Sequence, residues 1–266
     1  MPGFTILLPP AEGKQSGGNP FAPRMFDRGA NTFNYFSGLN PERRQLINAL
    51  HEQIESDDDL EKLFGVKGDT LGEALEANRA VFTNPVMSAL DRYSPGVMFQ
   101  AMDFQNLPTG AQRRLLEHGV IFSGLFGVLR PDDLIPNYRL KMDASVSGVG
   151  RVSTYWKPHV SRVLNELVDG RFVWNLLPGA HQAAWDDAGT YRGMVDVKFF
   201  KESDGERKAV THAVKPLRGK LVNLIVRESA ESPEVLFEAE VDGFRYDEDA
   251  STWSEDSKTG TIVMAK

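Results

Sequence analysis

Short apolar runs and amphipathic stretches alternate along the chain. Three continuous apolar runs have the length and composition of buried strands, at residues 4–8, 120–122 and 172–177. Period-2 alternation predicts another strand at 138–141, and around a polar turn at 203–205 it predicts an antiparallel hairpin from 195–199 and 210–214. Strands therefore occur from one end of the sequence to the other.

Apolar residues at helical spacing predict helices between these strands. They fall at residues 41–62, 71–77, 111–118, 151–168 and 217–228. Within the fourth stretch, Pro158 predicts that the regular helix starts late. A chain of 266 residues with 41% hydrophobic content can bury a large core, and we expect one domain over 1–266 or one domain with a helical insertion.

Several classes of protein are excluded by composition. No window approaches the roughly 18 apolar residues of a membrane span, and the N-terminus lacks the pattern of a signal peptide, which predicts a cytoplasmic protein. The absence of cysteine excludes disulfides, thiolate nucleophiles and zinc fingers. No two histidines show the H-x-x-x-H spacing, so we expect no dedicated metal site, and no cofactor motif is evident. The histidines are His51, His118, His159, His181 and His212.

The net charge of −7 is unevenly distributed. Residues 228–258 hold eleven Asp or Glu against Arg245 and Lys258, so the rest of the chain is slightly positive. An anionic partner is therefore compatible with the acidic total. An alternative is an interaction protein whose acidic C-terminal third binds a partner.

A basic cluster accompanies the most apolar part of the chain. Arg130, Arg139 and Lys141 lie beside a run that opens at Ser123-Gly124, where the backbone can turn sharply next to a ligand. The alternation of 138–141 would project Arg139 and Lys141 to one face. Lys215 and Arg218 start the helix at 217–228, and if they converge with Arg130 and Arg139, an anion would offset the repulsion.

Two glycine-containing segments are further candidates for anion binding. The loop AEGKQSGGNP at 11–20 combines Lys14 with Gly13, Gly17 and Gly18, and its amides could cradle a phosphate or carboxylate, although a polar surface loop has the same composition. At 65–68, Gly-Val-Lys-Gly separates two helical stretches in the pattern of a helix-hairpin-helix, inserted at about 41–80. A plain helical hairpin gives the same letters, and Glu61, Asp69, Glu73 and Glu76 would oppose a DNA contact.

Some residues are candidates for acid, base or nucleophilic chemistry. His181 follows the strand at 172–177, in a loop position where α/β proteins often bind ligands, although a simple connection is the alternative. Lys14 and Lys215 are the other candidates, and Glu12 and Asp186 are possible catalytic carboxylates that no spacing singles out.

Residues 123–142, SGLFGVLRPDDLIPNYRLKM, resemble the signature of the peroxide stress resistance protein YaaA family. In that signature Ser-Gly-Leu-Tyr-Gly-Val-Leu-Arg-Pro is followed by Pro-Tyr-Arg-Leu-Glu-Met, and this chain differs at Phe126, Asn137 and Lys141. Other landmarks follow in order along nearly the whole chain: LLPPAEGK at 7–14, Tyr155-Trp156, Asn175-Leu176, His212-Ala213-Val214-Lys215 with Arg218-Gly219, and Gly243-Phe244-Arg245-Tyr246. The opening is more similar to the actinobacterial branch.

The resemblance implies a single α+β domain, with a mixed sheet, a basic cleft and a helix-hairpin-helix. It also implies a cytosolic protein that binds DNA without sequence preference and limits iron-driven oxidative DNA damage. The alternative is an enzyme acting on a small anionic or nucleotide-like substrate in the same cleft. For either ligand we assign the binding surface to Lys14, Gly65, Lys67, Gly68, Ser123, Gly124, Arg130, Tyr138, Arg139, Lys141, Lys215 and Arg218.

Overall fold

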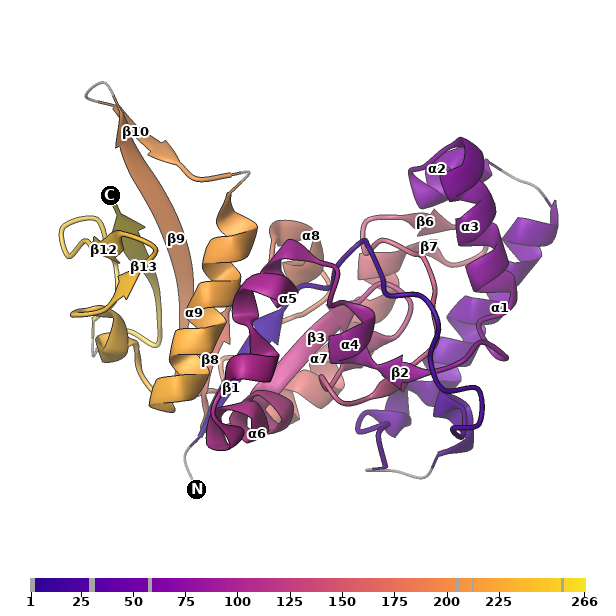
Figure 1. Cartoon of the computed structure of the whole chain (residues 1–266), viewed down its shortest axis with the longest axis horizontal. Helices are drawn as coiled ribbons and strands as arrows, with labels where there is room; N and C mark the ends of the chain where they lie inside the picture. Colours follow the sequence, from indigo (N-terminus) through magenta and orange to yellow (C-terminus); the bar gives the residue numbers. More distant parts are fainter. Residues whose placement is uncertain (1–2, 29–31, 57–58, 204–205, 212, 255) are drawn as a thin grey trace.

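The central element is a nine-stranded mixed sheet, seen in a computed structural model that describes residues 3–28, 32–56, 59–203, 206–211, 213–254 and 256–266 (Figure 1). The strand order is β11-β12-β13-β9-β8-β1-β3-β4, and β10 pairs with β9. The strands are β1 (Phe4–Leu8), β3 (Gly119–Ser123), β4 (Gly127–Leu129), β8 (Phe172–Asn175), β9 (Gly193–Ser203), β10 (Glu206–Ala209), β11 (Glu240–Val241), β12 (Phe244–Tyr246) and β13 (Thr259–Ala265).

The middle of the sheet is parallel. Strands β13, β9, β8, β1 and β3 run in one direction, and β1 pairs with β8 on one side and β3 on the other. Every residue of β1, β3 and β8 is buried, as expected of parallel strands covered on both faces. The carboxyl ends of these three strands therefore lie together at one edge of the sheet.

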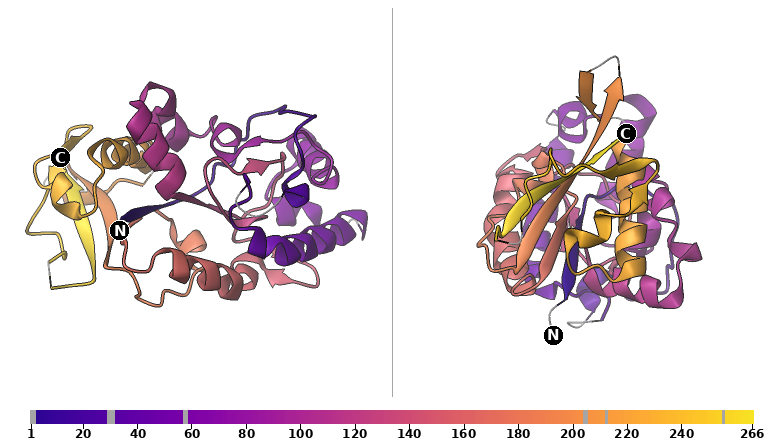
Figure 2. Two further views of the ribbon diagram at one scale, coloured as in Figure 1. Left: turned by 90° about the horizontal axis from the view of Figure 1, so that it is seen from below. Right: turned by 90° about the vertical axis from the view of Figure 1, so that its left-hand side faces the viewer.

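Helices cover both faces of the sheet. They are α1 (Asn40–Ser56), α2 (Leu60–Phe64), α3 (Gly68–Arg79), α4 (Ala89–Arg92), α5 (Val97–Met102), α6 (Thr109–His118), α7 (Val152–Leu167), α8 (Gly179–Gln182) and α9 (Val214–Glu228). Helices α5 and α9 lie on one side and α7 on the other (Figure 2, left). No helix in the described part of the chain is long and apolar enough to cross a bilayer.

Smaller elements join these layers. Two antiparallel pairs of two residues each are formed by β2 (Met87–Ser88) with β5 (Leu134–Ile135) and by β6 (Ser145–Val146) with β7 (Gly150–Arg151). Short 3₁₀ turns are η1 (Met25–Asp27), η2 (Ser37–Leu39), η3 (Phe104–Asn106) and η4 (Pro233–Leu236).

The structure is mixed α/β with one large mixed sheet, and the three predicted apolar strands are present as β1, β3 and β8. The helical segment at 41–62 is divided differently from the prediction. Helix α1 ends at Ser56, and α2 begins at Leu60 after Asp59, whose φ of 48° is left-handed and incompatible with a continuous helix. Leu60 and Leu63 are buried, so packing of this short helix decides the break.

The predicted strand at 138–141 is wrong. Arg139 does not pair with a neighbouring strand, because the Asn78 side chain satisfies its backbone: the Asn78 amide donates to Arg139 O (2.9 Å), and Arg139 N–H donates to Asn78 Oδ1 (3.2 Å). The segment is nevertheless extended enough for Arg139 and Lys141 to reach the same carboxylate. Alternation in this sequence therefore indicates an extended chain, held by a side chain from α3.

Two further boundaries differ from the predictions. The strand after the polar turn is β10, Glu206–Ala209, rather than 210–214, and α9 already begins at Val214. Helix α7 begins at Val152 rather than late, with Pro158 inside it. The carbonyl that lacks a helical donor because of Pro158 is that of Thr154, and this residue is exposed, so solvent can bond to it.

Candidate functional site

Polar residues gather at the carboxyl ends of β1, β3 and β8. Lys14 follows β1, Ser123 is the last residue of β3, and His181 lies in α8 after β8. Crossover connections that leave a parallel sheet toward opposite faces open a crevice at this edge, which is where ligands bind in such folds. The structure thus brings together three segments that the sequence identifies separately.

A chain of buried hydroxyl groups forms the base of this edge. The Tyr138 hydroxyl lies 2.6 Å from the Tyr93 hydroxyl and 2.7 Å from Ser123 Oγ, and Ser123 Oγ accepts the backbone N–H of Phe126 at 3.0 Å. Burial raises the pKa of Tyr138 to about 12 and that of Tyr93 well above its usual value. Both phenols are therefore neutral at physiological pH.

Lys14 lies above these phenols, partly buried. Its Nζ donates to Ala11 O at 3.3 Å and Glu12 O at 3.4 Å, and it lies 4.4 Å from the centre of the Tyr138 ring. Burial lowers the pKa of Lys14 to about 7, helped by the nearby Arg139 and Arg92 and opposed by Glu12. The loss of hydration outweighs the two carbonyls and the aromatic face, which favour the ammonium form.

Arg139 and Lys141 share one carboxylate beside Lys14. Glu12 Oε2 lies 3.8 Å from Arg139 Nη2, and Glu12 Oε1 lies 3.5 Å from Lys141 Nζ. The buried Nε of Arg139 has no partner among the described residues. We call Glu12, Lys14, Arg139 and Lys141 the Lys14 cluster. It combines three basic side chains with one acidic side chain.

The backbone approaches closely where this cluster is assembled. A Cβ on Gly124 would lie 2.4 Å from Leu140 O, so only glycine lets the end of β3 contact the 138–141 segment. Gly124 O also accepts the indole N–H of Trp156 at 2.8 Å. On the other side, the buried Arg92 donates to Gly17 O at 3.1 Å and to Gln15 O, which anchors the loop that carries Lys14.

A second polar group lies at the carboxyl end of β8, beside Asp196 of the neighbouring strand β9. Burial lowers the pKa of His181 to about 4, with Arg218 acting in the same direction and Asp143 opposing, so the imidazole is neutral at pH 7. His181 Nδ1 and Arg218 Nε are buried without a partner in the described part of the chain. Burial lowers the pKa of Arg218, and the nearby Asp196 carboxylate raises it. The Asn175 side-chain amide donates a hydrogen bond to Asp196 at 2.8 Å.

Arg130 does not join these residues. Its Nη1 donates to Gly119 O at 3.2 Å, at the amino end of β3, whereas Ser123 and the Lys14 cluster lie at the carboxyl end. The predicted convergence of Arg130 with Arg139 is therefore wrong, because β4 reverses the chain direction before Arg130.

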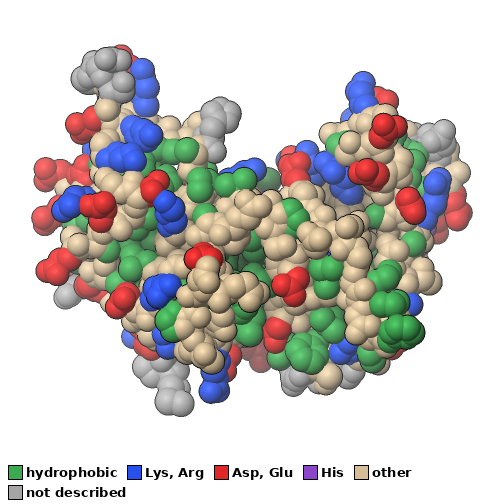
Figure 3. All heavy atoms as spheres, in the orientation of Figure 1, with side chains coloured by type: hydrophobic (Ala, Val, Ile, Leu, Met, Phe, Trp, Pro, Cys, Tyr) green, Lys and Arg blue, Asp and Glu red, His purple; other side chains and the backbone are tan. Residues whose placement is uncertain are grey.

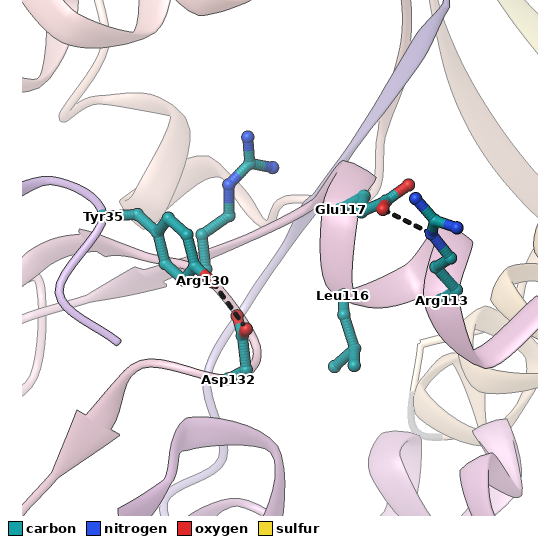
Figure 4. Close-up of a pocket in the computed structure, with 6 residues that line it drawn as sticks. All are labelled: Tyr35, Arg113, Leu116, Glu117, Arg130 and Asp132. Atoms are coloured by element: carbon teal, nitrogen blue, oxygen red, sulfur yellow. Dashed lines mark hydrogen bonds and ion pairs between the residues drawn. The ribbon is translucent and has the colours of Figure 1, made fainter. Parts of the chain in front are cut away.

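Arg130 instead lines a cavity of about 350 Å³ with Tyr35, Arg113, Leu116, Glu117 and Asp132 (Figure 4). Tyr35 donates to Asp132 at 3.0 Å, and Arg113 pairs with Glu117 at 2.6 Å. The Arg130 side chain lies between these two pairs. A second cavity, of about 260 Å³, is lined by residues of β9, including Asp196, by residues of β13 and by Thr252. Neither cavity contains a member of the Lys14 cluster.

The glycine turn at 65–68 lies next to the Lys14 cluster. A Cβ on Gly65 would lie 3.4 Å from Lys141 Nζ, and both Gly65 and Gly68 have left-handed φ angles of 63° and 55°. Lys67 is exposed and pairs with Glu61 at 2.9 Å. The first of the two helices that flank the turn, α2, has only five residues. The turn therefore extends the basic surface, with Lys67 already partly neutralised.

The remaining predicted candidates form no hydrogen bond or ion pair with the Lys14 cluster in the described part of the chain. Lys215 is exposed in the first turn of α9, and Asp186 pairs with Lys157 at 3.2 Å. His212 lies outside the described residues. The described part of the chain contains no group of three His, Asp or Glu side chains that could hold a metal ion.

Two structurally important residues were missed by the sequence reasoning. Tyr93 completes the hydroxyl chain from a position 45 residues before Tyr138, and Arg43 is fully buried in α1. The signal for Arg43 was present, since an arginine at position 43 lies on the apolar face shared by Leu46, Ile47 and Leu50.

The molecule is hollowed at the edge that carries the site. Figure 3 shows a depression along its upper side, between the β9–β10 hairpin on the left and α2 and α3 on the right. Apolar side chains make up much of the floor, and Lys and Arg side chains lie on a part of it and on the right-hand wall, with some Asp and Glu beside them. The depression is open to solvent rather than enclosed.

Known proteins of several bacteria are similar to this chain over most of its length. A family model described as peroxide stress protein YaaA matches residues 4–250. A UPF0246 protein of Streptomyces coelicolor is 30% identical over 237 residues, 88% of either chain. A UPF0246 protein of Corynebacterium glutamicum is 32% identical over 232 residues, 85% of this chain and 86% of the relative. An uncharacterized protein of Campylobacter jejuni is 26% identical over 235 residues, 87% and 88% of the two chains.

Proposed function

The chain belongs to the YaaA family of peroxide stress proteins, and on that premise we propose that it binds DNA without sequence preference during the peroxide stress response. Binding of this kind would shield DNA from iron-driven oxidation in the cytoplasm. The observation that carries the proposal is the charge of the Lys14 cluster, which combines three basic side chains with one carboxylate, that of Glu12, shared by Arg139 and Lys141. Phosphates are the anions that such an excess would attract.

The position of the glycine turn supports the same proposal. Its backbone at Gly65 lies beside Lys141, three residues before α3 begins, so the turn leads from the cluster to the free amides at the start of that helix. Helix N-termini bind phosphate through their free N–H groups. Because Glu61 pairs with Lys67, the cluster rather than Lys67 supplies most of the charge in this account.

Shape also favours a large ligand. A metabolite site buries most of its ligand in a concave pocket, whereas the hollow beside α2 and α3 is open, and the turn between these helices lies next to Lys141. The two described cavities, of about 350 and 260 Å³, lie elsewhere. Arg130 is excluded from the DNA-binding surface in this proposal, because it lies at the opposite edge of the sheet.

The test is fluorescence-anisotropy binding to duplex DNA over a salt series. Wild type should bind with micromolar affinity and lose affinity steeply as salt rises. Arg139→Ala/Lys141→Ala should weaken binding by about tenfold or more and reduce the salt slope by about two. Arg113→Ala is the matched control, since Arg113 is an exposed arginine at the other edge, and it should change affinity less than about twofold. No binding at low salt would disprove the proposal.

A second candidate function is an enzyme that acts on a small anionic or nucleotide-like substrate. The observation that favours it is the pKa of Lys14, which burial lowers to about 7 next to the buried phenols. Perturbed pKa values of this kind are common at catalytic sites. Thermal stabilisation by nucleotides or sugar phosphates that depends on Lys14, in a protein that does not bind DNA, would favour this candidate.

A further inference from the structure

The surroundings of the Lys14 side-chain amine suit it to covalent chemistry. Lys14 forms no ion pair within the described residues, and its Nζ is held by two backbone carbonyls and the face of Tyr138. The other basic members of the cluster, Arg139 and Lys141, take the Glu12 carboxylate instead. The structure thus separates one lysine from its acidic neighbour while placing two cations beside it.

The protonation state of Lys14 follows from this arrangement. A lysine with the ordinary pKa of 10.5 has about one neutral amine in three thousand at pH 7, whereas with a pKa of about 7 roughly half of the molecules carry a neutral amine. Desolvation and a neighbouring cation are the two features that activate lysines as nucleophiles toward carbonyl groups. Lys14 has both, because it is partly buried and Arg139 is close.

Intact DNA offers no aldehyde to such an amine. Loss of a base, a common outcome of oxidative attack, leaves a sugar whose ring-opened form has an aldehyde at C1′. We propose that Lys14 forms an imine with the C1′ aldehyde of an abasic site, while Arg139 and Lys141 bind the flanking phosphates. This inference rests on the proposed DNA binding and names the lesion that the Lys14 cluster would recognise.

The geometry fits this division of roles. Glu12 links the two functions, because its carbonyl accepts from Lys14 and its carboxylate contacts Arg139 and Lys141. A phosphate that displaced this exposed carboxylate would be held next to the Lys14 amine. The glycine turn at 65–68 lies beside Lys141, on the same side of the cluster.

The step balances without an added oxidant or reductant. The neutral amine of Lys14 attacks C1′ and forms a carbinolamine: a new C–N bond replaces the π bond of the carbonyl, and a proton from the nitrogen passes to the oxygen, which becomes a hydroxyl group. The carbinolamine then loses its oxygen as water, which carries away both hydrogens of the original amine. The product is an imine between Lys14 and the sugar, and hydrolysis reverses it.

The experiment is borohydride trapping on a duplex that contains one abasic site, with an intact duplex of the same sequence in parallel. Reduction of the imine gives a stable amine, so wild type should form a covalent adduct with the abasic duplex only. Mass spectrometry of the digested adduct should locate the sugar on Lys14. Lys14→Arg, which keeps the positive charge, should lose at least about 90% of the adduct. Lys220→Arg, at an exposed lysine of α9 that pairs with Asp242, should trap as wild type does.

Anisotropy on the same duplexes separates the two proposals. Wild type that binds both duplexes but forms no adduct, or whose adduct maps to another amine, would overturn the Lys14 inference and leave DNA binding intact. Equal trapping by Lys14→Arg would also overturn it. Absence of binding to either duplex would overturn the proposed function and this inference together.

Discussion

At the scale of single residues, two cations have opposite surroundings. Arg43 is fully buried, and its guanidinium donates to Phe126 O and Val128 O, both at 2.9 Å, and to Asn34 Oδ1 at 2.8 Å. Lys14, which is only partly buried, donates two long hydrogen bonds to carbonyls and lies over the face of the Tyr138 ring. Arg43 is therefore a structural residue that ties α1 to β4, whereas Lys14 is held loosely enough to react.

The environment of Lys14 predicts a pH-dependent stability. Because folding lowers the pKa of this base from 10.5 to about 7, the unfolded chain binds more protons between these values, and stability rises with pH across the window. The free energy of unfolding of wild type relative to Lys14→Met should rise by about 1–3 kcal/mol from pH 7 to pH 10. Urea denaturation at a series of pH values measures it. A flat difference would contradict the lowered pKa of Lys14.

Arg43 predicts a large loss of stability on truncation. Arg43→Ala leaves three carbonyl or amide oxygens without their donor in the interior, and it should lower the free energy of unfolding by about 3–5 kcal/mol. Arg44→Ala in the same helix is the control. Arg44 is exposed and stacks on Phe26, so its loss should change stability by less than about 1 kcal/mol. Comparable effects of the two variants would show that Arg43 has no special role.

Sequence patterns predict residues of the site better than the partners of those residues. Lys14, Ser123 and Arg139 were identified from glycine-containing loops and basic runs, because these depend on neighbours in the sequence. Tyr93 was not, because its partner Tyr138 lies 45 residues away, and Arg43 was not, although its place on the apolar face of α1 was a local signal. The wrong placement of Arg130 has the same cause as the omission of Tyr93, because the position of Arg130 depends on the reversal of the chain by β4.

At the scale of elements, continuous apolar runs predicted strands reliably, whereas alternation predicted the antiparallel pair of β9 and β10, with the wrong bounds for β10, and a strand at 138–141 that is absent. Strands β1, β3 and β8 are buried on both faces, so their sequences contain little except apolar residues. The alternating segment at 138–141 is extended without being a strand, since Asn78 replaces a strand neighbour. The end of α1 could not be predicted, because the break at Asp59 depends on tertiary packing of α2.

The packing of α5 against α9 gives a prediction at this scale. A Cβ on Gly219 would lie 2.2 Å from Met98 O and 2.8 Å from Met102 N, so the two helices touch through their backbones. Gly219→Ala should therefore lower the free energy of unfolding by about 1–3 kcal/mol. Gly72→Ala in α3, where no atom lies within 4 Å of the added Cβ, should instead stabilise by about 0.5–1 kcal/mol. Thermal denaturation of both variants measures the contrast, and stabilisation by both would refute the close packing.

At the scale of the whole molecule, charge and topology act together. The chain has a net charge of −7, yet the edge formed by the carboxyl ends of β1 and β3 carries the Lys14 cluster with an excess of basic side chains. The parallel order of β8, β1 and β3 places the loops after all three strands at this edge. An acidic protein can therefore present a local surface that attracts phosphate.

The affinity of Glu12→Gln for duplex DNA tests this account most directly. Glu12 is the one carboxylate of the Lys14 cluster, and its removal frees Arg139 and Lys141 for phosphate. We predict that Glu12→Gln binds about 3–10 times more tightly than wild type at low salt, with a salt slope steeper by about one. Binding that is unchanged or weaker in Glu12→Gln would contradict the assignment of DNA to the Lys14 cluster.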